Sequence, residues 1–146
     1  MRKERRMIMN TKTYTTLPQE AKDIRIEVFV KEQGFENEFD EIDTISHHIV
    51  VFDEGKPIGT CRFFKENNHY TIGRVAVLKE YRNQHIGNLL LKSAEKEIKK
   101  LNGDLIVVHA QVRVSPFYEN QGYIQFGQID DDEGVPHMWM KKKIQY

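Results

Sequence analysis

The stretch from Tyr70 to Ala110 constrains the fold more than any other part of the chain. Its pattern is strand-like, with a period near two, from Tyr70 to Val77, and has a period near 3.6 from Ile86 to Leu101. The first pattern predicts a strand. The second predicts a long helix whose apolar face is formed by Ile86, Leu89, Leu90, Ala94, Ile98 and Leu101. Residues 105–110 are almost continuously apolar, which is typical of a strand covered on both faces. Together they predict a strand–helix–strand crossover.

The remaining periodic segments place this crossover in a mixed sheet. A helix is expected after Thr16, its predicted N-cap, with Pro18 in the first turn and an end near Val30; a short helix is expected over 117–121. The other expected strands are residues 47–52, 58–65, 123–126 and 138–144. Antiparallel hairpins followed by a crossover predict an α/β (mixed α+β) fold, with one mostly antiparallel mixed sheet flanked by helices.

Length and composition limit the possible classes of protein. A chain of 146 residues with 39% hydrophobic residues predicts one domain over residues 1–146, with residues 1–12 expected to be a flexible, basic extension. The 22 basic and 22 acidic residues cancel, so no nucleic-acid partner is expected. No apolar run approaches ~18 residues, so no membrane partner is expected. The single cysteine, Cys61, is expected to be a buried, inert thiol in a cytoplasmic protein.

Two acidic segments stand out, residues 36–43 and 130–133. Such segments are usually solvated loops, and we expect that here. The alternative is an acidic rim that attracts a cationic, amine-bearing molecule. The side chains of Arg62 and Arg74 are expected to face either an acceptor cleft or solvent.

The polar turn between the strand and the long helix is the strongest candidate for a binding site. Residues 82–87 lead from the strand into the first helical turn, where unpaired backbone N–H groups and the helix dipole favour an anion. Arg82 adds a positive charge. A Walker loop is excluded because no Gly-Lys-Ser/Thr follows. The alternative is an ordinary strand–helix loop with a surface arginine.

Two segments of the sequence resemble motifs of the GCN5-related N-acetyltransferases, the GNAT superfamily. Arg82-Asn83-Gln84-His85-Ile86-Gly87 is similar to the family signature (Arg/Gln)-x-x-Gly-x-(Gly/Ala). Residues 114–123, Val-Ser-Pro-Phe-Tyr-Glu-Asn-Gln-Gly-Tyr, are similar to the A-x-x-F-Y-x-x-x-G-F segment. Residues 27–33, 109–111 and 134–137 resemble the ElaA-like branch, so the resemblance runs from about residue 14 to the end. It implies a GNAT fold with a splayed pair of strands.

The resemblance also implies acetyl-CoA as cosubstrate. Its pantetheine arm would pair with Val75, Ala76 and Val77, and its pyrophosphate would be held by Arg82, Asn83, Gln84, His85, Ile86 and Gly87, with Asn88 adding to the site. His85 departs from the family pattern, which usually has glycine there. Its imidazole would either crowd the phosphates or donate a hydrogen bond to one of them.

Three residues are candidates for the chemistry. Tyr118 matches the tyrosine that protonates the departing thiolate in many family members, and its alternative role is a core aromatic residue. Glu32 and His137 are candidates on the acceptor side, each with a purely structural alternative. No metal is expected, because no histidine pair has ligand spacing and the adjacent His47 and His48 point to opposite faces of a strand.

The resemblance therefore implies an N-acetyltransferase that moves an acetyl group to the primary amine of a small molecule or peptide by direct attack. A rival hypothesis is an acyl-CoA-binding or sensing protein without efficient turnover. His85 favours the rival hypothesis, and Tyr118 favours the enzyme. Whether the protein forms a homodimer is left open.

Overall fold

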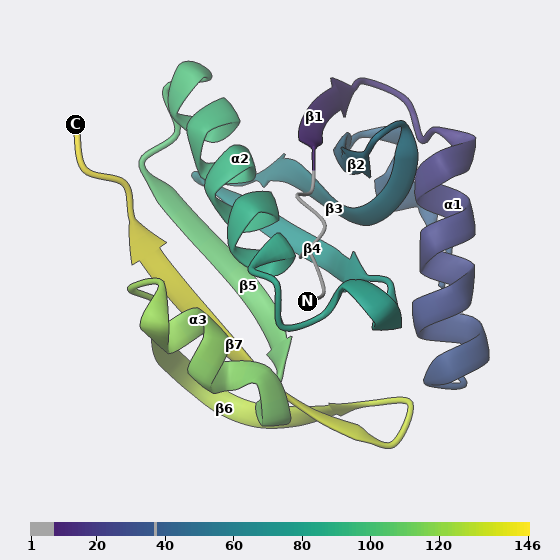
Figure 1. The fold of residues 1–146 in the computed structure, drawn as a ribbon. Helices are drawn as coiled ribbons and strands as arrows, with labels where there is room; N and C mark the ends of the chain where they lie inside the picture. The colour runs from purple at the N-terminus through teal and green to yellow at the C-terminus, as the bar shows by residue number, and fades with distance from the viewer. Residues whose placement is uncertain (1–7, 37) are drawn as a thin grey trace, which may run out of the picture.

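The computed structural model describes residues 8–36 and 38–146, and in these residues seven strands form one sheet in the order β1-β2-β3-β4-β5-β7-β6 (Figure 1). Neighbouring strands are antiparallel except β4 and β5, which are parallel. The strands are β1 Met9–Tyr14, β2 His47–Asp53, β3 Lys56–Glu66, β4 His69–Val77, β5 Leu105–Gln111, β6 Ile124–Asp132 and β7 Val135–Lys143. The predicted mixed sheet is confirmed.

Three α-helices flank the sheet, α1 Gln19–Arg25, α2 Ile86–Lys100 and α3 Ser115–Asn120. A π-helical segment, Ile26–Glu32, continues α1, and short 3₁₀ helices cover Glu41–Thr44, Lys79–Tyr81 and Val112–Val114. Side chains alternate along β2, so Ile49 and Val51 join the core beneath α2, while Val50 and Phe52 join the core beneath α1. Helices α1 and α2 therefore cover opposite faces of the sheet.

The parallel strands β4 and β5 separate halfway along their length. Residues Tyr70–Ile72 of β4 pair with Ile106–Val108 of β5. Beyond these residues the two strands do not pair, although β4 continues to Val77 and β5 to Gln111. In the β3–β4 register, Gly73 faces Arg62 and Ala76 faces Thr60, so two β4 residues lie opposite one β3 residue. This is a β-bulge, and Arg74 adopts the positive φ of 51° within it. The bulge bends β4 away from β5 and opens the sheet where the candidate site lies.

The structure differs from the sequence predictions at several boundaries. Residues 9–12, expected to belong to a flexible extension, start β1 and pair with β2. Their side chains are exposed and mostly polar, so they carried no hydrophobic signal. Residues 1–7 of that expected extension lie outside the described residues. Helix α1 has Pro18 rather than Thr16 at its N-cap, and α3 starts two residues earlier than predicted. Strand β6 extends to Asp132 and forms a long hairpin with β7.

Within residues 8–36 and 38–146, no helix is both long enough and apolar enough to span a membrane.

Candidate active site

A cavity of about 580 Å³ lies beside the N-terminal end of α2, between the end of β4 and α3. Most of the residues expected to hold acetyl-CoA line it: Val75, Ala76, Val77, Arg82, Asn83, His85, Ile86, Gly87 and Asn88. Gln84, the remaining one, does not; its side-chain amide donates to the carbonyl of Glu80 at 3.4 Å. The loop and the splayed strand thus form one wall around a common space.

The backbone of the loop leaves hydrogen-bond donors facing this cavity. His85 is the N-cap of α2 and makes no side-chain capping hydrogen bond. The N–H groups of the first turn have no acceptor within the helix, so they are available to an anion. His85 has φ = 62°, in the left-handed region that favours glycine. The usual family glycine at this position is therefore explained by the backbone, and histidine is strained there.

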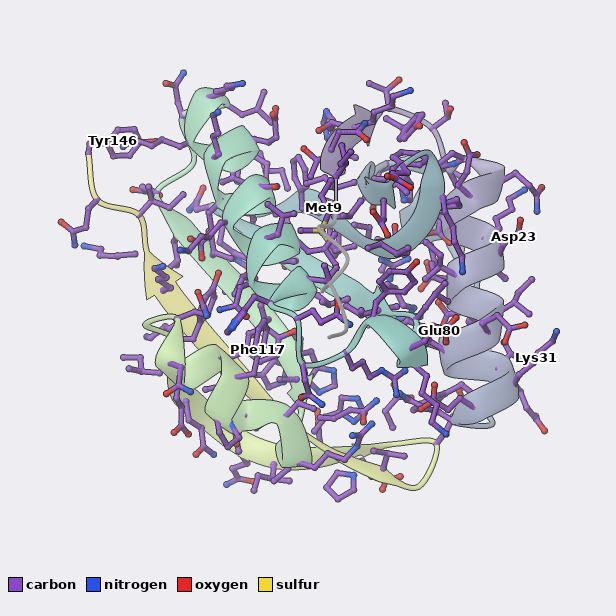
Figure 2. The ribbon with its side chains drawn as sticks, in the orientation of Figure 1. Met9, Asp23, Lys31, Glu80, Phe117 and Tyr146 are labelled. Atoms are coloured by element: carbon purple, nitrogen blue, oxygen red, sulfur yellow. The ribbon has the colours of Figure 1, made fainter. Side chains whose placement is uncertain are left out.

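Gly87 keeps the first turn of α2 in close contact with α3. A Cβ added there would lie 3.3 Å from two ring atoms of Phe117, closer than an ordinary van der Waals contact. Figure 2 shows Phe117 below the N-terminal end of α2. A side chain at position 87 would push against this ring, which itself lines the cavity.

Arg82 and Glu32, expected to act on cofactor and acceptor respectively, contact each other. The guanidinium donates to both carboxylate oxygens, at 2.6 and 2.7 Å, and its Nε donates to the carbonyl of Val77 at 3.1 Å. The hydrogen bond from Arg82 lowers the pKa of Glu32, so this carboxylate is ionised. Glu32 is not among the residues lining either cavity described here. Its observed partner is the loop at the cofactor cavity.

Tyr118 lies where two cavities meet. It lines the 580 Å³ cavity and also a second cavity of about 250 Å³. The side chain is 7% exposed, and its hydroxyl makes no hydrogen bond to the described residues. Burial, together with the nearby Cys61, raises the pKa of Tyr118. The hydroxyl is therefore protonated at neutral pH and can donate a hydrogen bond to a group bound between the cavities.

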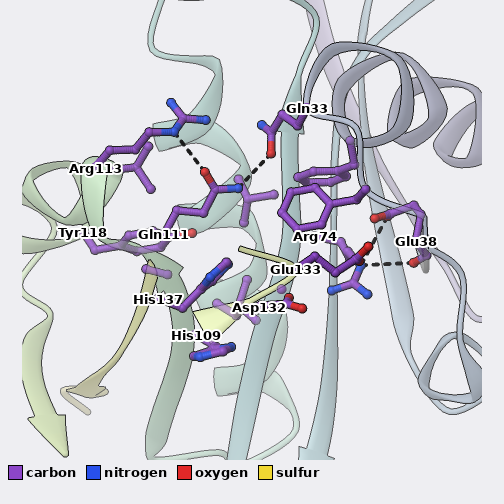
Figure 3. Close-up of a pocket in the computed structure, with 17 residues that line it drawn as sticks. Gln33, Glu38, Arg74, His109, Gln111, Arg113, Tyr118, Asp132, Glu133 and His137 are labelled. Carbon is purple, nitrogen blue, oxygen red and sulfur yellow. Dashed lines mark hydrogen bonds and ion pairs between the residues drawn. The ribbon is translucent and has the colours of Figure 1, made fainter. Parts of the chain in front are cut away.

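The second cavity contains His137 in a defined tautomer (Figure 3). Its Nδ1 lies 2.8 Å from the carbonyl oxygen of Val135, and a carbonyl can only accept. Nδ1 therefore carries the hydrogen, and in the neutral ring Nε2 has the lone pair. The residue is 6% exposed. His137 therefore lines the second cavity, and its role as a base stays a prediction.

His109 and Asp130 form a pair beside His137 that the sequence analysis did not select as site residues. His109 Nε2 lies 2.6 Å from Asp130 Oδ1, and its ring stacks on Trp139 with centroids 4.3 Å apart. The His109 and His137 rings are 4.8 Å apart. The hydrogen bond from His109 lowers the pKa of Asp130. His109 stands in a segment that resembles the ElaA-like branch, and this was the one signal in the sequence for the pair. Asp130 could not be matched to it, because Asp130 lies on another strand.

Three arginines and three acidic residues form a closed ring of ion pairs beside the second cavity. Each carboxylate contacts two arginines. The pairs, in order, are Arg25–Glu38 at 2.6 Å, Glu38–Arg74 at 3.2 Å, Arg74–Asp40 at 3.4 Å, Asp40–Arg62 at 2.6 Å, Arg62–Asp43 at 2.9 Å and Asp43–Arg25 at 2.8 Å. The prediction that residues 36–43 form a solvated loop is therefore wrong for Glu38 and Asp43, which are buried against the arginines. This charge ring holds Glu38, the one residue of the segment 38–44 among those lining the cavity.

Burial affects the acids of the charge ring unequally. Burial opposes ionisation of Asp43, but hydrogen bonds and charges of Arg25 and Arg62 outweigh it and lower the pKa of Asp43 to about 2. For Glu38, burial outweighs the arginines and raises the pKa. Arg62 faces this ring rather than solvent, whereas Arg74 belongs to the ring and also lines the cavity.

Cys61 is buried, as predicted, and burial raises its thiol pKa to about 12, so the thiol is not ionised at neutral pH. In the part of the chain that the structure describes, no three His, Cys, Asp or Glu side chains are grouped so as to hold a metal ion.

Comparison with known proteins identifies the family. The family model described as "Acetyltransferase (GNAT) domain" matches residues 14–144. The chain is 36% identical over 122 residues to "Uncharacterized N-acetyltransferase YjcF" of Bacillus subtilis (strain 168), covering 82% of this chain and 87% of that protein. The fold matches the crystal structure of Escherichia coli ElaA with a TM-score of 0.81, 22% identity and coverage of 94% and 99% of the two chains.

The structure of an aminoglycoside 6'-N-acetyltransferase complexed with coenzyme A shares the fold at 15% identity, with a TM-score of 0.70 and coverage of 86% of this chain and 89% of that one. A splayed mixed sheet with a loop at the start of α2 is the architecture of this class. The chain belongs to the GNAT acetyltransferase family. The resemblance inferred from the motifs, including that to ElaA, is confirmed.

Proposed function

We propose that this protein transfers an acetyl group from acetyl-CoA to a primary amine of a small molecule. One observation carries the proposal. Tyr118 lines both a cavity formed by the family's cofactor motif and a separate cavity that contains a histidine with a free lone pair. Two substrates, one in each cavity, would meet at this side chain.

The first cavity has the features that coenzyme A requires. Backbone N–H groups at the start of α2, together with the nearby Arg82, suit the pyrophosphate. The segment Val75–Val77 lies on the part of β4 that has no β5 partner, so its edge is available to the pantetheine amides. Gly87 lets Phe117, which also lines this cavity, pack against the first turn. These features support binding of coenzyme A by the residues inferred from the motif.

The chemistry can be assigned to two side chains. Acetyl-CoA supplies an acetyl thioester. His137 Nε2 accepts the proton that the acceptor amine loses as its nitrogen bonds to the acetyl carbon. Tyr118 donates its proton as the carbon–sulfur bond breaks and the thiolate leaves. The buried site excludes bulk water, which strengthens both hydrogen bonds.

The acceptor cavity of about 250 Å³ is small for a ligand pocket, and such pockets usually measure about 300–1,000 Å³. A small-molecule amine suits it. The rival hypothesis, a non-catalytic acyl-CoA sensor, draws on His85, whose side chain lines the cofactor cavity where the family usually has glycine.

Two measurements on the same preparation test the proposal. Acetyl-CoA should raise the melting temperature, since saturation at 100 times the dissociation constant contributes about 2.7 kcal/mol. Thiol release should then occur with at least one member of a panel of amino acids, aminosugars and polyamines. Binding without release for every amine would favour the sensor. No thermal shift at millimolar acetyl-CoA would contradict both hypotheses.

A further inference from the structure

The acceptor cavity has two chemically different ends. Tyr118 and His137 lie on the side formed by α3 and β7, whereas Glu38 and Arg74 lie on the other side, next to β4 (Figure 3). The strand order places β5 between β4 and β7, so the two ends are separated across the splayed part of the sheet. An acceptor that reaches Tyr118 with one end therefore meets Glu38 and Arg74 with its other end.

Glu38 has one carboxylate oxygen without a partner among the described residues. Its Oε1 contacts both Arg25 Nε, at 2.6 Å, and Arg74 Nε, at 3.2 Å. Its Oε2 makes no hydrogen bond in the part of the chain that is described. The residue is 4% exposed and lines the cavity. A carboxylate oxygen that is free to accept in a cavity suits a charged donor, and an ammonium group supplies one.

Arg74 is in the complementary situation. Its Nε contacts Glu38 and its Nη2 contacts Asp40 at 3.4 Å, while Nη1 makes no hydrogen bond within residues 8–36 and 38–146. The guanidinium lines the cavity and is oriented by the charge ring and by the bulge at its own backbone. A free guanidinium donor in a cleft suits a carboxylate, because charged hydrogen bonds of this type are the strong ones.

From these two atoms we infer that the acceptor carries a zwitterionic α-amino-carboxylate group at the end remote from the amine that is acetylated. Its carboxylate would accept from Arg74 Nη1, its ammonium would donate to Glu38 Oε2, and its second amine would reach Tyr118 and His137. The acceptor class is thus a diamino acid acetylated on its side-chain amine. This inference rests on the proposed function.

The charges around the cavity favour this class over a polyamine. The charge ring is neutral as a whole and presents one negative and one positive group to the cavity, which matches a zwitterion. A polyamine would satisfy Glu38 but would place a second cation against Arg74. The other charged or titratable groups that line the cavity are Asp132, Glu133, Arg113, His109, His137 and Tyr118. Asp132 and Glu133 exceed Arg113 by one negative charge, which a ligand with a net charge of +1 would neutralise.

Matched acceptors test each contact separately. L-Lysine is compared with 1,5-diaminopentane, which lacks the carboxylate, and with 6-aminohexanoate, which lacks the α-amine. L-Ornithine, 1,4-diaminobutane and 5-aminopentanoate form the shorter series. Thiol release at fixed acetyl-CoA should give a kcat/KM for one diamino acid about 10- to 100-fold above both of its analogues, as expected for loss of one charged hydrogen bond. Mass spectrometry should place the acetyl group on the side-chain nitrogen.

Two variants should remove these preferences one at a time. Arg74→Gln should abolish the preference for the diamino acid over the diamine and keep the preference over the amino acid that lacks the α-amine. Glu38→Gln should abolish the preference over the amino acid that lacks the α-amine and keep the preference over the diamine. Glu41→Gln is the control, since Glu41 is an exposed acid of the same segment that neither belongs to the charge ring nor lines the cavity, and it should keep both preferences.

The outcomes separate this inference from the proposed function. Efficient acetylation of polyamines or monoamines with no preference for a diamino acid would overturn the inference and leave the acetyltransferase intact. If no amine releases thiol, titration calorimetry of L-lysine and L-ornithine with the protein decides the matter. Binding that both Arg74→Gln and Glu38→Gln weaken about tenfold or more would support the inference. Absence of binding would overturn it.

Discussion

The charge ring should make stability fall steeply in acid, with Asp43 as the main cause. Hydrogen bonds and charges of Arg25 and Arg62 lower the pKa of Asp43 from 3.8 to about 2. A lowered carboxyl pKa stabilises the fold above the unfolded value and loses that effect as the pH falls through the folded value. At 1.36 kcal/mol for each pH unit, the difference between 3.8 and about 2 amounts to about 2.4 kcal/mol, lost between about pH 5 and pH 2.

The neighbouring acids modify this loss in opposite directions. The pKa of Asp40 is also lowered, because hydrogen bonds and charges from Arg62 and Arg74 outweigh its burial, so Asp40 adds to the acid loss. The raised pKa of Glu38 acts against it, since protonation of a buried carboxyl as the pH falls favours the folded state. Both acids contact arginine through both oxygens, but Asp43 dominates because its side chain is buried whereas that of Asp40 is 35% exposed.

Urea denaturation of the wild type and Asp43→Asn at a series of pH values checks this reasoning. The variant should lose about 2.4 kcal/mol or more of unfolding free energy at pH 7, because Arg25 and Arg62 lose a charged partner, and its stability should vary less between pH 5 and pH 2. Asp104→Asn, an exposed acid outside the ring, is the matched control and should behave as wild type. An Asp43→Asn protein as stable as wild type, or one with the full acid loss, would refute the argument.

Further predictions concern the cofactor cavity. His85→Gly should raise the free energy of unfolding by about 0.5 kcal/mol, because relief of the left-handed backbone (about 1–2 kcal/mol) exceeds the entropy cost of glycine (about 0.4–1 kcal/mol). Calorimetry of the same variant should show weaker coenzyme A binding if the imidazole contacts a phosphate, and tighter binding if the imidazole crowds the phosphates. Gly87→Val should weaken coenzyme A binding at least tenfold by displacing Phe117 into the cavity, and unchanged affinity would disprove this contact. Arg82→Gln should weaken coenzyme A binding, whereas Glu32→Gln should not, because removing the carboxylate frees the Arg82 guanidinium for the ligand. Equal losses of affinity in both variants would indicate that the Arg82–Glu32 ion pair, and not the charge of Arg82 alone, supports binding.

Local periodicity accounts for what the sequence could predict of the fold. Helix α2, the β2–β3–β4 hairpins and β5 are long, strongly patterned segments, and each was predicted within one or two residues of its observed ends. Strand β1 was missed because its polar, exposed residues show no apolar alternation, and its support comes from pairing with β2. The extension of β6 was missed for the same reason, since its end is acidic and exposed.

The candidate site also has one part that the sequence could predict and another that it could not. The cofactor loop is contiguous in sequence, so its motif places nearly all of its residues at one cavity. The charge ring could not be predicted, because its members lie on four separate segments between Arg25 and Arg74. A run of acids resembles a solvated loop when the arginines that pair with it are distant in sequence. Likewise, His109 and Asp130 are 21 positions apart and meet only through the β5–β7–β6 pairing.

Residues with a left-handed backbone conformation show a further limit of prediction from sequence. Arg74 and His85 both have positive φ, and neither is glycine. Sequence patterns that expect glycine at such positions find only a departure at His85 and nothing at Arg74. The bulge at Arg74 is what separates β4 from β5, so the feature that opens the site has no local signature in the sequence.

The most direct test of the central claim is the turnover of Tyr118→Phe compared with its affinity for acetyl-CoA. The substitution keeps the ring, which packs between Phe117 and Tyr123, and removes only the hydroxyl. With an acceptor that the wild type uses, kcat should fall about 100-fold or more, while acetyl-CoA binds with nearly unchanged affinity and the melting temperature is kept. Normal turnover by Tyr118→Phe would contradict the account, because the leaving thiolate would then take its proton from another group.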